Sequence, residues 1–199
     1  MTCSCKTTAP LPNEYRTVPF WSWNDELEPD ELVRQIRAMK QAGLGGFFMH
    51  ARSGLKTPYM GERWFECVKV CILEAERLGL DAWLYDEIGW PSGFGGGEVN
   101  ASGDEFRQKF LRFRTVRREE CAVEQVAGLY SPDGSRYLGS DPSELPAGEI
   151  LEITYEVNPF YVDVLNPAVT EKFLAVTHQR YFDTLGAGLC RRIKGIFTD

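Results

Sequence analysis

The feature that most limits the fold of this chain is a unit that recurs along its first half. Each unit consists of a short apolar strand, a polar loop, an amphipathic helix and a glycine, after which the next strand begins. The first strand is predicted at Val18–Asn24, and a helix follows from Pro29, a residue that suits a first helical turn. Gly43 is predicted to end that helix in the left-handed cap position, before a second strand, Leu44–His50. This second strand is apolar on both faces, which is typical of a buried parallel sheet in an α/β protein.

The unit occurs twice more along the chain. A helix is predicted over 62–78 and a third strand over 80–86. Near the end, Asn166 is predicted to cap a helix that opens with Pro167, and the fourth strand is predicted at 195–199. The buried face of that last helix is predicted from its apolar spacing to carry Val169, Phe173, Thr177 and Tyr181. Strands that alternate with helices imply right-handed crossovers and a parallel sheet.

Between the third strand and the last helix the pattern changes. A glycine-rich loop over 88–97 lacks the Lys-Ser/Thr ending of a phosphate-binding loop. From 109 to 157 hydrophobic and polar residues alternate with period two, and the turn signal Ser131–Gly134 lies inside this stretch, which predicts an inserted antiparallel β-module. The predicted organisation is a flexible tail over 1–16, strands one to three with helices over 17–108, the β-module over 109–157, and the last helix with strand four over 158–199.

Composition excludes several classes of partner. The net charge is −7, and no Lys/Arg stripe is available to neutralise the phosphates of a nucleic acid. No stretch approaches the roughly 18 to 20 apolar residues that cross a bilayer. The N-terminal residues lack the apolar core of a secretion signal, so we expect a cytoplasmic protein, or a secreted one only if a leader preceded this sequence.

The six cysteines do not indicate a metal site. Cys3 and Cys5 have no further Cys or His partners nearby, as a zinc site would require. Cys67 and Cys71 lie on one face of a predicted helix, where we expect buried thiols that act as small hydrophobes. No metal ligand is therefore assigned.

Polar and ionisable residues follow the first three predicted strands. They are Asn24, His50, and Asp86 with Glu87. Because ligands bind at the carboxyl ends of strands in parallel α/β folds, we expect a functional site at this edge.

Five segments resemble glycoside hydrolase family 106 and its uncharacterised relatives, in the right order over about residues 17 to 199. Trp83–Gly93, with its Tyr-Asp-Glu-x-Gly-Trp-Pro-Ser-Gly string, is the most specific of them. The others are Pro19–Asn24, Gly45–His50, Tyr161–Pro167 and Gly195–Asp199. The known activity of that family is α-L-rhamnosidase.

The resemblance implies a (β/α)8 TIM-type barrel, of which this chain would form the first four βα units, with the small antiparallel insertion before the fourth strand. It also implies inverting hydrolysis by two carboxylic acids and, as in the characterised enzyme, a calcium ion near the sugar. In similar sequences the Phe-Thr-Asp string continues with a catalytic Glu, whereas this chain ends at Asp199. We therefore expect the fragment to be inactive alone, with the partner carboxylate supplied by later strands.

Inverting glycosidases hold their two carboxyl groups about 6.5 to 9.5 Å apart, to admit a water molecule between them and the sugar. The candidate catalytic residues here are Asp86, Glu87 and Asp199. Adjacent strand residues point to opposite sides, so at most one of Asp86 and Glu87 should enter the barrel mouth. In the structural alternative one of them caps the glycine-rich loop and the other pairs with Arg52 or is solvated.

Aromatic and hydrogen-bonding groups near the strand ends suit a sugar ring, which needs a flat apolar face beside polar groups. The predicted substrate-binding residues are Trp21, Trp23, Asn24, His50, Arg52 and Trp90. One shared cleft is expected to hold Trp21 or Trp23, Asn24, His50, Asp86 or Glu87, and Asp199. The alternatives are that the tryptophans belong to the core and that Asn24 and His50 cap loops. His178, Trp64 and Trp83 are assigned to structure.

The sequence thus favours part of a glycoside hydrolase acting on α-L-rhamnoside-like linkages of a carbohydrate. The alternative is a non-catalytic carbohydrate-binding relative of the barrel. A nucleotide-binding protein is set aside, because the loop after the first strand is acidic and free of glycine.

Overall fold

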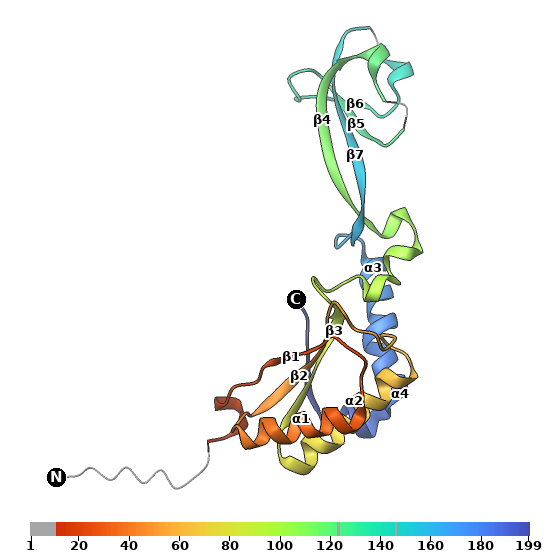
Figure 1. The fold of residues 1–199 in the computed structure, drawn as a ribbon. Helices are drawn as coiled ribbons and strands as arrows, with labels where there is room; N and C mark the ends of the chain where they lie inside the picture. The colour runs from red at the N-terminus through yellow and green to blue at the C-terminus, as the bar shows by residue number, and fades with distance from the viewer. Residues whose placement is uncertain (1–10, 123, 146) are drawn as a thin grey trace, which may run out of the picture. The chain divides into compact units, whose positions relative to one another are not determined.

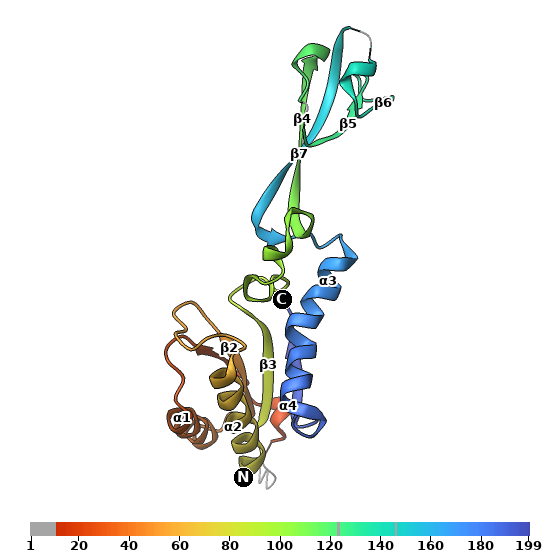
Figure 2. The same ribbon diagram turned by 90° about the vertical axis from the view of Figure 1, so that its right-hand side faces the viewer.

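A computed structural model of the chain describes residues 11–122, 124–145 and 147–199. The chain forms two compact units, one built from the residues before 100 and after 169, the other from Asn100–Val169 (Figures 1 and 2). The elements of the first unit are β1 (Phe20–Trp23), α1 (Pro29–Gln41), β2 (Gly46–Ala51), α2 (Glu62–Leu78), β3 (Asp81–Ile88), α4 (Arg180–Cys190), β8 (Ile193–Phe197) and the short turns η1 (Asn13–Tyr15), η2 (Gly95–Gly97) and η7 (Ala175–Gln179). Helix α3 (Pro167–Leu174) leads from the second unit into η7.

The first unit contains a parallel sheet with the strand order β1-β2-β3-β8. Trp23 aligns with Ala51 across β1 and β2, and Leu84 aligns with both Met49 of β2 and Ile196 of β8. The four predicted strands are therefore confirmed, in sequence order and all parallel. That they belong to a (β/α)8 barrel stays a prediction.

Local sequence signals set the ends of the helices. Pro29 opens α1, and Gly43 follows its end with φ +84°. Gly79 ends α2 with φ +63°, a left-handed conformation that glycine adopts at little steric cost. The side chain of Asn166 accepts a hydrogen bond from the N–H of Ala168 at 3.1 Å, so the predicted cap of α3 is confirmed.

The helices cover one face of the parallel sheet. Trp23 of β1 packs edge-on against Trp64 of α2, with ring centroids 5.0 Å apart, and Phe47 of β2 belongs to the same buried cluster. Tyr181 of α4 joins this cluster and accepts a hydrogen bond from the indole N–H of Trp64 at 3.2 Å. The opposite face of the sheet carries a second set of aromatic residues: Phe20, Phe48, Tyr85 and Phe197.

The second unit is an antiparallel sheet with the order β4-β7-β5-β6. Its elements are η3 (Asn100–Ser102), η4 (Asp104–Phe106), β4 (Arg107–Arg117), η5 (Arg118–Glu120), β5 (Val126–Tyr130), β6 (Tyr137–Gly139), η6 (Pro142–Glu144) and β7 (Glu149–Val162). The predicted β-module is thus present.

The module is longer than its predicted bounds of 109–157. Strand β7 continues through Pro159, where the sequence indicates a return to the barrel, and Arg107 pairs with Val162. The register shifts between Arg107 and Gln108, so β7 has extra residues without partners on β4. Pro159 is one of them and therefore needs no ladder hydrogen bond. A bulge of this kind cannot be recognised from period-two alternation.

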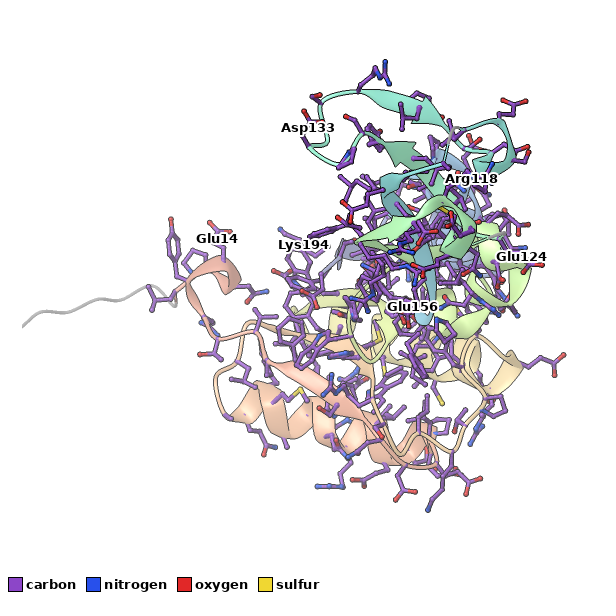
Figure 3. The ribbon with its side chains drawn as sticks, turned by 90° about the horizontal axis from the view of Figure 1, so that it is seen from above. Glu14, Arg118, Glu124, Asp133, Glu156 and Lys194 are labelled. Atoms are coloured by element: carbon purple, nitrogen blue, oxygen red, sulfur yellow. The ribbon has the colours of Figure 1, made fainter. Side chains whose placement is uncertain are left out.

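The turn between β5 and β6 forms where it is predicted. The N–H of Gly134 donates to the carbonyl of Ser131 at 2.7 Å, and Gly134 has φ +72°. Asp133, labelled in Figure 3, accepts hydrogen bonds from the hydroxyls of Ser131 and Ser135. These bonds close the turn on both sides.

The predicted N-terminal tail, residues 1–16, lies only partly within the residues that the structure describes. Residues 1–10, with Cys3 and Cys5, lie outside the described residues. Residues 11–16 are not loose, because they include η1 and the amide of Asn13 donates to the carbonyl of Gly79 at 3.0 Å. Within the described ranges, no helix is both long and apolar enough to cross a bilayer.

Candidate functional site

Asp86, near the end of β3, has no exposed surface. Its Oδ1 accepts a hydrogen bond from the Ser92 hydroxyl at 2.5 Å, and its Oδ2 accepts one from the Thr198 hydroxyl at 2.6 Å. Ser92 in turn accepts a hydrogen bond from the backbone N–H of Asp199 at 3.1 Å. Asp86 therefore connects β3, the glycine-rich loop and the residues that follow β8.

Glu87 is equally buried but holds the glycine-rich loop. Its carboxyl oxygens accept three backbone N–H donors: Ile88 at 2.9 Å, Gly95 at 2.6 Å and Gly96 at 2.6 Å. Burial raises the pKa of Glu87, although the three N–H groups act in the opposite direction. This geometry is the loop cap that the sequence offers as the alternative to catalysis.

His50, near the end of β2, lies in an aromatic surround. Its ring stacks on Tyr85 at 4.0 Å between centroids, and Trp90 lies 5.8 Å away. Burial lowers the pKa of His50, while a hydrogen bond with the backbone of Gly89 acts against that shift. Its buried Nε2 has no hydrogen-bond partner among the residues that the structure describes. The ring therefore keeps one buried nitrogen whose hydrogen bond is not made within the described residues.

Trp90 and Arg52 form the outer part of this cluster. Trp90 is 56% exposed, and the Arg52 guanidinium carbon lies 3.9 Å from the ring centroid of Trp90. Arg52 is predicted to bind substrate or, in the structural alternative, to pair with Asp86 or Glu87, and the structure places its guanidinium on the aromatic face of Trp90. Asp199 is exposed, and its negative charge favours protonation of His50.

The tryptophans of β1 do not join this cluster. Trp21 and Trp23 point to the helix-covered face, where Trp21 donates to Gln35 Oε1 at 2.8 Å. The neighbouring Phe20 points to the other face, 5.6 Å from the ring of His50. The expectation that Trp21 and Trp23 share one cleft with His50 is therefore wrong, because alternate residues of a strand point to opposite faces.

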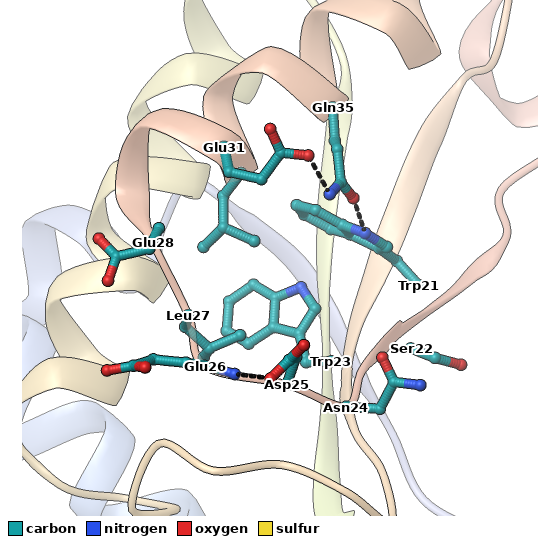
Figure 4. Close-up of a pocket in the computed structure, with 11 residues that line it drawn as sticks. Trp21, Ser22, Trp23, Asn24, Asp25, Glu26, Leu27, Glu28, Glu31 and Gln35 are labelled. Atoms are coloured by element: carbon teal, nitrogen blue, oxygen red, sulfur yellow. Dashed lines mark hydrogen bonds between the residues drawn. The ribbon is translucent and has the colours of Figure 1, made fainter.

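Trp21 and Trp23 instead line a pocket of about 230 Å³ with Asn24, the loop after β1 and the start of α1 (Figure 4). Two carboxylates of this lining are already paired: Glu28 with Arg63 at 2.8 Å and Glu31 with Arg34 at 2.6 Å. A third, Asp25, pairs with Lys56 at 2.7 Å. A substrate role for Trp21, Trp23 and Asn24 stays a prediction for this separate pocket.

His178 lies at the site, although the sequence assigns it to structure. Its Nε2 is 3.7 Å from Asp86 Oδ2. Ser92 and Thr198, which bind Asp86 directly, were also missed. The Asp86–Ser92 pair lies within the quoted Tyr-Asp-Glu-x-Gly-Trp-Pro-Ser-Gly string and could have been suspected. No sequence signal reveals His178, because the π-helical turn that carries it looks like ordinary helix.

The calcium ion implied by the resemblance does not fit the described residues. No group of three or more His, Cys, Asp or Glu side chains in the described ranges could hold a metal ion. Asp86 and Glu87, the buried carboxyls nearest the site, direct their oxygens to hydroxyl and N–H donors instead. Calcium, which takes six to eight oxygen ligands, would need additional oxygen ligands here.

No known family and no curated protein matches the chain. Among solved structures, a rhamnosidase from Novosphingobium sp. PP1Y is similar to part of it, with a TM-score of 0.44 and 25% sequence identity. The similarity covers 53% of this chain and 10% of that chain, so this chain spans a small fraction of the length of the rhamnosidase. The likeness to this rhamnosidase is distant.

Proposed function

We propose that this chain forms the first four βα units of a (β/α)8-barrel glycoside hydrolase that acts on α-L-rhamnoside-like linkages. Support comes from the quoted motifs and from the four parallel strands, whose helices lie on one face. The observation that carries the proposal is that His50, Asp86 and Asp199 lie at the carboxyl ends of the parallel strands β2, β3 and β8, where Ser92 links the Asp86 carboxylate to the backbone of Asp199. Parallel α/β folds bind ligands at this edge.

The hydrogen bonds divide the three acidic candidates into two kinds. Asp86 and Glu87 are buried and already accept two and three hydrogen bonds respectively, so we assign them to holding the site. Asp199 is exposed after β8, beside His50, and is the carboxyl group that can meet a glycosidic oxygen or a water molecule. Its partner acid, about 6.5 to 9.5 Å away in an inverting site, would come from later strands.

Sugar recognition is assigned to His50 and Trp90. Burial lowers the pKa of His50 and so favours the neutral ring, and its Nε2, which has no hydrogen-bond partner among the described residues, is assigned to a sugar hydroxyl. The exposed ring of Trp90 offers a flat apolar surface, and Arg52 lies on that ring. A sugar presents both an apolar C–H face and hydroxyl groups, which fits this combination.

The test measures binding and turnover on the same 199-residue sample. We expect methyl α-L-rhamnopyranoside to bind in ligand-observed NMR, and Trp90→Ala to weaken binding by about tenfold, a loss of about 1.4 kcal/mol. Phe182→Ala, which removes a comparably exposed ring (51%) from α4, should leave binding unchanged. A sugar that does not bind the parent chain, or that binds Trp90→Ala equally well, contradicts the proposal.

The same sample should not hydrolyse an aryl α-L-rhamnoside. A missing general acid or base lowers the rate by about 100- to 10,000-fold, and one member of the pair is assigned to strands outside this chain. Turnover above background would show that the described residues suffice for hydrolysis. That result would contradict the division of the acids between two halves of a barrel.

A second candidate is a non-catalytic carbohydrate-binding relative. It is favoured by the hydrogen bonds that Asp86 and Glu87 already accept within the protein, two and three respectively. The two proposals separate when hydrolysis is measured in a protein that joins this chain to the further strands a barrel requires. Binding without turnover in that protein favours the second candidate.

A further inference from the structure

The indole nitrogen of Trp23 is a buried hydrogen-bond donor that has no partner among the residues that the structure describes. Trp23 is 2% exposed, so bulk solvent does not satisfy this N–H. In Figure 4 the nitrogen lies on the edge of the ring that is turned toward Trp21, whose ring centroid is 5.5 Å away. A contact between an N–H and an aromatic ring is much weaker than a hydrogen bond to oxygen. The donor therefore needs an acceptor from outside the described residues.

The same ring lines the pocket of about 230 Å³ between β1, the loop after it and the start of α1 (Figure 4). The neighbouring donors of this pocket are already used, because Trp21 donates to Gln35 and Gln35 donates to Glu31, both at 2.8 Å. Glu31 accepts two further hydrogen bonds from Arg34, at 2.7 and 2.6 Å, and the bonding to Arg34 lowers the pKa of Glu31 to about 2. An ionised carboxylate has about four acceptor positions, so Glu31 keeps one that a ligand can use.

The lining limits the chemistry of an occupant. Four carboxylates line the pocket, and the cations that pair with three of them lie outside the lining, so an anion would be repelled. A cation would be attracted but has no lone pair to accept the N–H of Trp23, and an apolar molecule would also leave that N–H unpaired. A hydroxyl group meets both requirements, since its oxygen accepts and its hydrogen donates. The four carboxylates belong to Asp25, Glu26, Glu28 and Glu31.

We propose that this pocket binds a neutral sugar ring, as a second carbohydrate site on the helix-covered side of the sheet. One hydroxyl oxygen of the sugar accepts from Trp23, a hydroxyl hydrogen is donated to Glu31, and the C–H face of the ring packs on Trp21. The cavity is smaller than the roughly 300 to 1,000 Å³ of pockets for drug-sized ligands, which suits a single ring. The site goes beyond the proposed function and uses neither His50 nor Trp90.

The first experiment reads the Trp23 donor directly. The chain contains five tryptophans, so ¹⁵N-tryptophan labelling gives five indole N–H signals. Contacts with the ring of Trp64, 5.0 Å away between centroids, assign the signal of Trp23 by the nuclear Overhauser effect. We expect methyl α-D-glucopyranoside to shift this signal saturably. The indole nitrogen of Trp83 is also buried and without a partner in the described ranges, but it does not line the pocket, so its signal should stay in place.

Charge and acceptor are then varied one at a time. The methyl glycoside of D-glucuronic acid has the same ring with a carboxylate at C6 and should bind at least about tenfold more weakly. Glu31→Ala should weaken the glucoside by about tenfold, whereas Asp30→Ala, an exposed carboxylate of the same helical turn outside the lining, should not. Replacement of Trp23 by benzothienylalanine, which exchanges the N–H for sulfur and keeps the ring shape, should also weaken the glucoside by about tenfold.

Three results would overturn the proposal. They are a Trp23 signal that the glucoside does not move, equal binding of the glucoside and the glucuronide, and equal affinity of the parent chain and the benzothienylalanine protein. A Trp23 N–H that exchanges with water and does not respond to sugar would show that the pocket holds water alone, which also overturns it.

The two carbohydrate sites are distinguished by their own indole signals. The signal of Trp90 reports the site of the proposed function, and that of Trp23 reports this pocket. If the glucoside moves Trp23 while methyl α-L-rhamnopyranoside leaves Trp90 unchanged, the proposed function fails and the second site stands. If the rhamnoside moves Trp90 while neither sugar moves Trp23, the second site fails and the proposed function stands.

Discussion

Removal of the Glu87 carboxylate should release the glycine-rich loop from the sheet. The change is Glu87→Ala, which leaves the N–H groups of Ile88, Gly95 and Gly96 without their acceptor. The bond from Gly95 is fully buried, whereas the other two are partly buried. Water can therefore replace the carboxylate at Ile88 and Gly96 more readily than at Gly95.

The expected magnitude follows from these three bonds. Hydrogen bonds to a charged group contribute about 1.5 to 3 kcal/mol each, and an unsatisfied buried donor costs about 1 to 3 kcal/mol. Two effects offset part of this loss of stability. Water rehydrates the partly buried donors, and the variant no longer buries the Glu87 carboxyl group, whose pKa burial already raises. We expect a net loss of about 2 to 4 kcal/mol in the free energy of unfolding, a large share of the roughly 5 to 15 kcal/mol typical of a domain.

The assay is urea unfolding followed by tryptophan fluorescence. All five tryptophans precede residue 100, so this signal reports the first unit and includes Trp90 of the loop itself. Glu98→Ala removes an exposed carboxylate from the same segment and should cost less than about 1 kcal/mol, as surface ion pairs do. A loss below about 1 kcal/mol for Glu87→Ala, or equal losses for both variants, would refute the reasoning.

The sign of the pH dependence gives a second check on Glu87. Its folded pKa is raised above the unfolded value, so its contribution is fully present below that unfolded value and declines as pH rises through the folded pKa. The difference in stability between the parent chain and Glu87→Ala should therefore be larger at pH 4 than at pH 8. A difference that grows with pH would contradict the raised pKa.

Three further predictions concern other parts of the chain. The hydrogen bond from Arg77 lowers the pKa of Glu74 to about 2, so the ionised Glu74 stabilises the parent chain above about pH 4.5, and this contribution is lost as the pH falls toward 2. Glu74→Gln should lack this contribution, which urea unfolding at several pH values would measure. Glu152→Ala removes a fully buried carboxylate of the second unit and should cost about 2 to 4 kcal/mol there, seen as faster amide exchange in β5 and β7 with unchanged tryptophan emission. Burial raises the pKa of Cys67 to about 11 and that of Cys71 well above its usual value, so neither thiol should react with a disulfide reagent until urea unfolds the chain.

Most of the first unit could be predicted because its signals are local. Pro29 and Gly79 mark helix ends through their own backbone preferences, and the helix over 62–78 was predicted with the bounds that α2 has. The four strands follow from apolar runs between such markers. The polar residues at the strand ends were also visible, and His50, Asp86 and Asp199 do meet at one edge.

The errors arise where the outcome depends on distant parts of the chain. The face that Trp21 and Trp23 adopt depends on strand register, and a shift of one residue would exchange them with Phe20 and Ser22. The position of His178 depends on a π-turn whose wider winding has no local signature. The reach of β7 past Pro159 depends on a bulge against β4. For the tryptophans of β1 and for β7, pairing with a remote segment outweighs the local preference.

The place of the second unit within the chain has a consequence for the order of folding. It lies between β3 and the helices that lead to β8, so 78 residues separate Ile88 from Pro167, a long loop to close before β8 can pair. Pairing of Arg107 with Val162 closes most of that loop and leaves 22 residues to span, 89–106 and 163–166. The entropic cost of closing the loop then falls by about 1.1 kcal/mol, roughly sevenfold in the chance of encounter. A β-module that folds first would thus act as an internal template, which shortens the search that β8 makes for β3.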